Sequence, residues 1–191
     1  TPELQQLTAA DSGISVVGHS VNFNSAAIAF SSTADLLATN PPGTAGERAL
    51  YRIGRKATQL VQVTSPSPSG FFSESPSQSR KRFIAFASDA DLVAGSNGDG
   101  NTEIFLWDAN LPSSPYTQVT NTTGCTNAMP SVGAKARYIA FQSTCDLLGN
   151  GSNSGQAIFL YDRDKDGFAS GIVLKGPGGY DSSLPQVSRI V

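Results

Sequence analysis

Three copies of one short run decide the fold of this chain: Ile28-Ala29-Phe30-Ser31, Ile84-Ala85-Phe86-Ala87 and Ile139-Ala140-Phe141-Gln142. Each copy continues into a tail that contains Asp-Leu. The spacing of the three phenylalanines defines an internal repeat of about 55 residues. Such a repeat constrains the fold more strongly than any local propensity.

Two further markers keep the same spacing. Ile104-Phe105-Leu106-Trp107-Asp108 returns one repeat later as Ile158-Phe159-Leu160-Tyr161-Asp162. Triplets of glutamine, an aliphatic residue and threonine begin at Gln6, Gln62 and Gln118, in two equal steps. Three independent markers in one register indicate three repeats.

Each repeat predicts four strands. The first strand carries a proline (Pro76, Pro130 or Pro185), the second is the Ile-Ala-Phe run, the third is the Ile-Phe-Leu run, and the fourth holds the glutamine triplet. The second and third strands are apolar at successive residues, which predicts burial on both faces. Four-stranded antiparallel sheets covered on both faces by neighbouring sheets form a β-propeller. The predicted fold class is therefore all-β, with about three four-stranded antiparallel blades.

The pattern Ile-Ala-Phe-x-Ser-x-x-Asp-Leu, followed by Ile-Phe-Leu-x-Asp, resembles the WD40-like (PD40) repeats of TolB-like β-propellers over essentially the whole chain. WD40 repeats proper are shorter, at about 40–45 residues, and carry a Gly-His signature. The resemblance implies an open or partial ring of a six-bladed type. The first repeat departs from the pattern, because Ala49-Leu50-Tyr51-Arg52-Ile53-Gly54 lacks the closing aspartate.

Length and charge exclude several classes of protein. The 191 residues carry a formal net charge of −2, and only 15% of them are charged. A binder of nucleic acid needs a basic footprint, which this balance does not provide. No stretch approaches the ~20 consecutive apolar residues that span a membrane. No cofactor is required by any motif in the chain.

The repeat also predicts the domain organisation. We expect one partial propeller unit over residues 1–191, since even four blades of this length need about 220 residues. The chain is then either a piece of a longer protein or a half-ring whose partner supplies the other blades, and both options leave apolar blade edges open to self-association. The predicted segments are blades at 17–64, 72–120 and 128–176, a preceding fourth strand at 1–10 and a following first strand at 183–191.

The two cysteines, Cys125 and Cys145, flank the predicted hairpin between the first and second strands of the third repeat. The expected turn is 133–136, whose midpoint is equally far from each cysteine. Residues equidistant from a hairpin turn face one another, within reach of a disulfide. Such a bond indicates an extracytoplasmic location, which is periplasmic, cell-surface or secreted. Two buried free thiols are the alternative.

One stretch has the start of a calcium-binding loop. Asp162, Asp164 and Asp166 stand at alternate positions before a glycine, and the carbonyl of Phe168 and the hydroxyl of Ser170 could complete the site. The bidentate glutamate of an EF-hand is missing. The sequence therefore predicts either a Ca²⁺ site or an ordinary polar turn between the third and fourth strands.

The other acids and the histidine favour structure over catalysis. We expect Asp35, Asp91 and Asp146, one per blade, to hold the turn after the second strand by bonding backbone N–H groups. His19 is the single histidine, so a nucleophile would have one candidate base, and we place it in a loop before the first strand. The chain is therefore predicted not to be an enzyme.

The sequence favours a non-catalytic binding or scaffolding module, the function that the TolB resemblance implies, with protein or glycan as the ligand. The first alternative is the propeller portion of a larger hydrolase of the prolyl-oligopeptidase type. The second is a structural half-propeller that oligomerises through its open blade edges. The scaffold alone does not name the ligand, because function in such folds lies in the loops.

Overall fold

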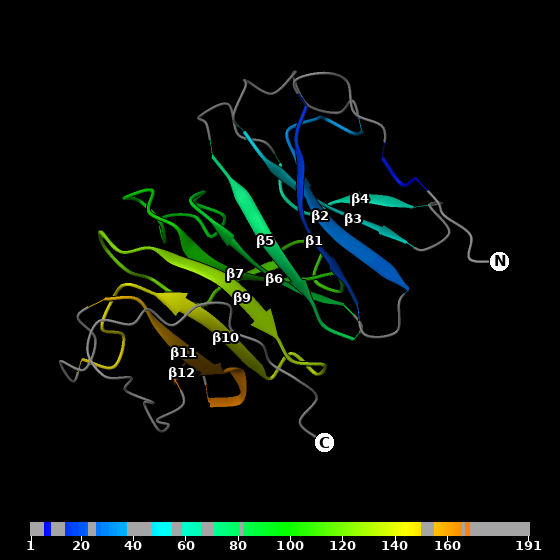
Figure 1. The fold of residues 1–191 in the computed structure, drawn as a ribbon. Helices are drawn as coiled ribbons and strands as arrows, with labels where there is room; N and C mark the ends of the chain where they lie inside the picture. The colour runs from blue at the N-terminus through cyan, green and yellow to red at the C-terminus, as the bar shows by residue number, and fades with distance from the viewer. Residues whose placement is uncertain are drawn as a thin grey trace.

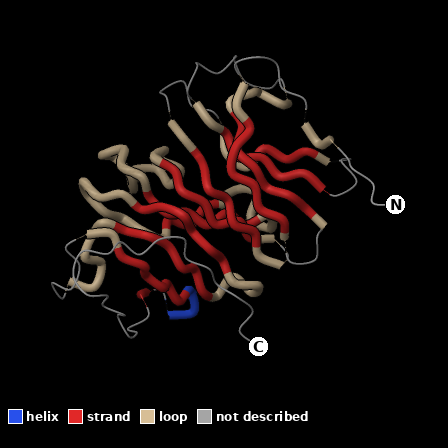
Figure 2. Tube along the Cα trace, viewed as in Figure 1, coloured by secondary structure: helices blue, strands red, loops and turns tan. Residues whose placement is uncertain are grey.

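The computed structural model of the chain describes residues 6–8, 14–22, 26–37, 47–54, 59–65, 71–80, 82–149, 155–165 and 167–168. Within these ranges the regular structure is β-strand, apart from one turn of 3-10 helix, η1 (Arg163–Lys165), drawn in blue in Figure 2. The described residues contain no helix that is long and apolar enough to cross a bilayer.

The strands form three antiparallel sheets, each built from four consecutive strands (Figure 1). The first sheet contains β1 (Val16–Val21), β2 (Ala27–Ser32), β3 (Ala49–Gly54) and β4 (Leu60–Gln62). The second contains β5 (Ser73–Gln78), β6 (Phe83–Ser88), β7 (Glu103–Asp108) and β8 (Tyr116–Gln118). The third contains β9 (Asn127–Val132), β10 (Tyr138–Ser143), β11 (Ala157–Asp162) and β12 (Gly167–Phe168). The prediction of all-β propeller blades is confirmed.

The sheets stack face to face, as blades do. β5 contacts β1, β2 and β3 of the first sheet, and β9 contacts β5, β6 and β7 of the second. In each sheet an aromatic ring of the second strand stacks on one of the third, with centroids about 6 Å apart, a spacing that favours offset stacking. The three pairs are Phe30–Tyr51 at 5.9 Å, Phe86–Phe105 at 5.9 Å and Phe141–Phe159 at 6.1 Å.

Burial on both faces, expected from the apolar runs, is present in β6. Ile84 and Phe86 belong to the hydrophobic core between the first and second sheets. Ala85 and Ala87, on the other face of the strand, belong to the core between the second and third sheets. Each of the four side chains is at most 1% exposed.

The third sheet lacks a comparable neighbour among the described residues. Ile158 and Leu160 in β11 are 43% and 37% exposed, whereas Ile104 and Leu106 at the same positions of β7 are 0% and 3% exposed. Ile104 and Leu106 are buried because the third sheet packs against them. The described part of the chain is therefore an open stack of three blades and not a closed ring.

A repeated serine contact joins neighbouring blades at their first strands. The Gln78 N–H in β5 donates to the Ser20 hydroxyl in β1 at 3.1 Å. The Val132 N–H in β9 donates to the Ser77 hydroxyl in β5 at 3.0 Å. The two serines hold the same position in their strands. The strands β1, β5 and β9 therefore lie side by side in the row where the sheets converge (Figure 1).

A β-bulge interrupts each first strand at the same place. In all three sheets the pairing between the first and second strands shifts by one residue midway along the strands. The extra residue has a positive φ, which is 56° at Gly18, 53° at Ser75 and 50° at Met129. Residues with a side chain rarely adopt this conformation, so the surrounding packing must hold it.

The placement of His19 in a loop is wrong, because this residue lies inside β1, directly after the bulge. The bulge disturbs the alternation by which a strand is recognised in a sequence. The domain boundaries stay a prediction, since positions 169–176 and 183–191 lie outside the described residues. Of the predicted strand at 1–10, only residues 6–8 are described, and they are in no strand.

Candidate functional site

One side of the stack carries the longest described loops. The second strand of each blade ends on this side, and the third strand begins there. The loop 89–102, the connection 119–126 and both cysteines lie on it, and we call it the disulfide face. The opposite side carries the hairpin turn at Gly133 and the turn that contains Leu111.

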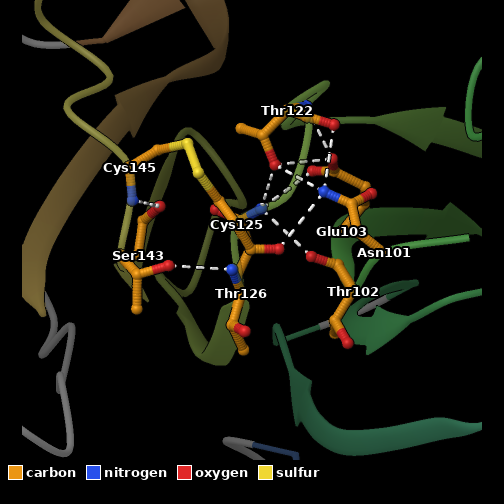
Figure 3. The surroundings of a disulfide bond; sticks show 10 residues. Asn101, Thr102, Glu103, Thr122, Cys125, Thr126, Ser143 and Cys145 are labelled. Atoms are coloured by element: carbon orange, nitrogen blue, oxygen red, sulfur yellow. Dashed lines mark hydrogen bonds between the residues drawn. A yellow bond between two sulfur atoms is a disulfide. The ribbon is translucent and has the colours of Figure 1, made fainter. Parts of the chain in front are cut away.

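Cys125 and Cys145 form a disulfide, with their Cα atoms 5.5 Å apart (Figure 3). The hairpin turn lies where it was predicted, since the Ala136 N–H donates to the Gly133 carbonyl at 2.8 Å. The bond ties the start of β9 to the loop after β10. It therefore links the first two strands of the third blade at their ends on the disulfide face.

The bulge in β9 makes this pairing possible. Next to the turn, Val132 pairs with Ile139, and an uninterrupted ladder would place Cys125 opposite Asp146. The extra residue of the bulge shifts the register by one, which brings Cys125 opposite Cys145 instead. Equal distance from the turn in the sequence therefore predicts the right partner, but the bulge is what brings the two cysteines opposite each other.

Beside the disulfide, a buried carboxylate closes the junction between the second and third blades (Figure 3). Glu103 is 0% exposed. It accepts hydrogen bonds from the Thr122 N–H at 2.5 Å, the Thr122 hydroxyl at 2.7 Å and the Asn127 side-chain amide at 3.0 Å. The Asn101 amide donates to the carbonyls of Thr122, at 2.9 Å, and Cys125, at 3.2 Å. A buried carboxylate with three donors is well satisfied, and its hydrogen bonds join the second and third blades at this edge.

At the equivalent edge of the first two blades the structure has a pocket of about 240 Å³, lined by Arg48, Phe72, Glu74, Ala87, Asp89 and Thr102. The Arg48 guanidinium forms an ion pair with Glu74 at 3.1 Å, and its Cζ lies 5.9 Å from the centre of the Phe72 ring. The Phe72 N–H donates to the Asp89 carboxylate at 2.6 Å. A guanidinium, two carboxylates and an aromatic wall therefore meet at this junction.

Backbone contacts fix the pocket. The Ser73 N–H donates to the Arg48 carbonyl at 3.0 Å, which ties the segment before β3 to the start of β5. The adjoining loop is held by Asp91, which accepts hydrogen bonds from Gly95, Ser96 and Asn97 at 2.7–3.1 Å. These hydrogen bonds, that from Gly95 first, lower the pKa of Asp91. These hydrogen bonds therefore hold two of the described segments that carry the pocket residues.

The Asp89 carboxyl has an unfavourable electrostatic environment. Burial is the largest influence and raises its pKa above the ordinary value, the hydrogen bond from Phe72 lowers it, and the negative charge of Glu74 raises it further. Asp89 takes part in no ion pair within the described ranges. A cation close to Asp89 would relieve this penalty.

The acids that the sequence assigned to turns follow the second strands, as their spacing requires. Asp35 accepts a hydrogen bond from the Leu37 N–H at 3.2 Å, two residues on. Asp91 accepts the three described above. Asp146 lies in the corresponding turn after β10, where its carbonyl accepts the Gly149 N–H at 3.1 Å.

The predicted calcium ligands fall partly outside the described residues, which exclude Asp166 and Ser170 and place only the backbone of Phe168. Asp162 is 2% exposed and accepts two hydrogen bonds from Arg137, both of 2.9 Å, and Asp164 lies 3.2 Å from the same guanidinium. The hydrogen bonds from Arg137 lower the pKa of Asp162. A cation at this loop would compete with Arg137, and the calcium site stays a prediction.

The sequence patterns do not predict that Glu103 and the pocket residues lie at the junctions between blades. A usable signal exists in the repeat itself, because Glu103 replaces the alanines found at the same position of the other blades, Ala49 and Ala157. A carboxylate in a column of alanines marks a position where one blade departs from the shared scaffold.

No protein-family model matches the chain, and no curated protein matches it in sequence. Solved structures do match. A TolB from Agrobacterium tumefaciens is 18% identical with a TM-score of 0.55, over 88% of this chain and 48% of that one. The chain has a TolB-like β-propeller fold. It spans about half the length of that TolB.

Peptidase propellers are similar as well. The β-propeller domain of the Trilobed protease from Pyrococcus furiosus is 11% identical with a TM-score of 0.52, over 85% of this chain and 43% of that one. A prolyl endopeptidase is 14% identical with a TM-score of 0.54, over 84% of this chain and 22% of that one. At these identities the likeness establishes the propeller module alone. The described part of the chain contains no catalytic domain beside its blades.

Proposed function

We propose that this TolB-like chain is a non-catalytic binding module that recognises a partner protein through its disulfide face. The observation that carries the proposal is the charged pocket between the first two blades, on a face stiffened by the disulfide and by the hydrogen bonds of Glu103. A neutral glycan offers no charge to Glu74 and Asp89, so a protein partner suits the pocket better.

The disulfide supports an extracytoplasmic site of action. A bond that closes a loop of this size stabilises the folded state by about 3 kcal/mol in the chain-entropy model, and such bonds are typical of oxidising compartments and rare in reducing ones. Mass spectrometry of the natural protein after alkylation without reductant tests this assignment. No alkylated thiol is expected, and two alkylated thiols would contradict it.

Site-specific photo-crosslinking tests the binding face. A photoreactive phenylalanine replaces Phe72 on the disulfide face or, as the matched control, Leu111 on the opposite side; these side chains are 39% and 53% exposed. In the natural full-length protein we expect a discrete crosslinked protein from position 72 and none from position 111. The captured protein is then purified and its affinity for the wild type measured. Identical products from both positions, or none from position 72, would refute the proposal.

The second candidate function is the propeller portion of a larger hydrolase. The likeness to a prolyl endopeptidase and to the Trilobed protease propeller favours it. The sequence of the whole gene distinguishes the two candidates. An adjoining hydrolase domain favours the second, and further repeats of the same length and pattern favour the first.

A further inference from the structure

The repeat provides three copies of one structural contact, and the blades differ in how they make it. The residue after each second strand accepts a hydrogen bond from a backbone N–H that precedes the first strand of the same blade. In the first and third blades the acceptor is a threonine hydroxyl, at 2.9 Å in both cases, and in the second it is a carboxylate at 2.6 Å. The acceptors are Thr33, Thr144 and Asp89.

A hydroxyl is therefore sufficient for the structural task at this position. Asp89 makes the same contact with one oxygen, and it adds a second oxygen and a negative charge that the blade does not need. The pocket also departs from the repeat at Glu74, which corresponds to Val17 and Ala128 in the other first strands. Two carboxylates thus replace uncharged residues at one junction.

These charges are not balanced within the pocket. Arg48 pairs with Glu74 at 3.1 Å, and it is the one cation among the residues that line the pocket in the described part of the chain. Asp89 is left without an ion pair there, at a half-buried position where a carboxylate is costly. The arrangement has room for one more positive charge.

The apolar wall of the pocket places a second requirement on the ligand. The Phe72 ring, 39% exposed, is a flat apolar surface beside the carboxylates. A volume of about 240 Å³ is below the range of about 300–1,000 Å³ of pockets for drug-sized ligands, so a single side chain is a suitable occupant. Lysine and arginine combine a positive head group with an apolar stem that lies along such a surface.

We propose that the pocket formed by Arg48, Phe72, Glu74 and Asp89 binds the cationic side chain of a lysine or arginine that a partner protein presents. This inference rests on the proposed function, and it names the chemistry by which the disulfide face recognises its partner. The cation pairs with Asp89 and shares Glu74 with Arg48, while its stem lies against Phe72.

Four capped tripeptides test the proposal by NMR titration of the folded chain. They are acetyl-Gly-X-Gly-amide with X as arginine, lysine, norleucine or glutamate. We expect saturable shifts of the backbone N–H signals of Phe72 and Asp89 with arginine and lysine, and none with norleucine or glutamate. Equal shifts with norleucine would overturn the role of charge, and no saturable shift with either cation would overturn the proposal.

The other two blades indicate which substitution tests the role of the charge. Asp89→Thr installs the residue of the other two blades, so it keeps the hydrogen bond to Phe72 and removes the charge. We expect it to weaken the binding of the arginine peptide about tenfold or more, as the loss of a desolvated charge pair implies. Asp99→Asn is the matched control, because it removes one negative charge from an exposed loop position outside the pocket. It should leave the affinity within about twofold. Equal losses in both variants, or no loss in Asp89→Thr, would overturn the proposal.

The crosslinking experiment separates this inference from the proposed function. If position 72 captures a discrete partner and Asp89→Thr abolishes the capture, both are supported. If the capture survives Asp89→Thr at full yield, the binding face stands and the basic-side-chain inference fails. If position 72 captures nothing while the arginine peptide still binds, the pocket chemistry stands and the proposed protein partner fails.

Discussion

The two junctions between described blades differ in the environment of their carboxylates at the same edge. Between the second and third blades, Glu103 is fully buried and its oxygens are occupied by Thr122 and Asn127. Between the first and second blades, Glu74 and Asp89 are partly exposed around a pocket with a single cation. The closed network stabilises the stack, whereas the open cluster leaves charge available to a ligand. Equivalent positions of one repeat can therefore serve the fold in one place and recognition in another.

The largest expected effect comes from opening the closed junction. Glu103→Ala installs the residue of the other blades, yet it removes the charged acceptor of three hydrogen bonds, which come from the Thr122 N–H, the Thr122 hydroxyl and the Asn127 amide. We expect the free energy of unfolding, measured by urea denaturation, to fall by about 4 kcal/mol. The matched change at the open junction, Glu74→Ala, removes a partly exposed ion pair and should cost less than about 1 kcal/mol. Equal losses would mean that the junctions do not differ as described.

The disulfide beside the closed junction gives the next effect. Replacement of Cys125 and Cys145 together by serine should lower the free energy of unfolding by about 3 kcal/mol, because the bond closes a loop with a sequence separation of 20. Reductant should destabilise the wild type by a similar amount and leave the double variant unchanged. A wild type that is insensitive to reductant would contradict this expectation.

The open face of the third blade gives a smaller effect. Ile158→Ser with Leu160→Ser removes two exposed apolar side chains, so we expect less self-association at high concentration and a change in stability within about 1 kcal/mol. Sedimentation velocity measures the association. Leu111→Ser, which changes an exposed apolar residue on a turn, is the control and should leave the association unchanged. Persistent association in the double variant would show that another surface is responsible.

The smallest effect concerns the stability cost of the pocket. Since folding raises the pKa of Asp89, its ionised form destabilises the folded state at neutral pH, and the penalty disappears as the pH falls toward the ordinary value of 3.8. We therefore expect Asp89→Thr to raise the free energy of unfolding at pH 7 by less than about 1 kcal/mol. The gain should shrink as the pH approaches 3.8. A variant that is less stable than the wild type at every pH would contradict a binding role for this carboxylate.

The fold could be predicted because its determinants are repeated. An apolar run such as Ile84-Ala85-Phe86 requires cover on both faces, and three copies in one register leave few architectures besides stacked blades. The bulges could not be predicted, because Gly18, Ser75 and Met129 share no residue type. Their positive φ is imposed by packing between the strands and not by local preference.

The candidate site could not be predicted from the sequence for a different reason. Motif searches look for what the repeats share, and the shared acids such as Asp91 hold turns. The residues that distinguish the junctions, Glu103 and Asp89, differ from the other blades at their positions. Their chemistry becomes visible only when three-dimensional neighbours from different repeats, such as Arg48 and Glu74, are brought together.

The serine contacts between first strands have a consequence for how such proteins change in evolution. Each contact involves only a blade and the next one, so no bond between the first strands of described blades depends on how many blades follow. Nearest-neighbour coupling of this kind lets a gene gain or lose one whole repeat while every remaining junction keeps its contacts. Copy number and binding specificity can then vary separately, the first by duplication and the second by substitution at a single junction.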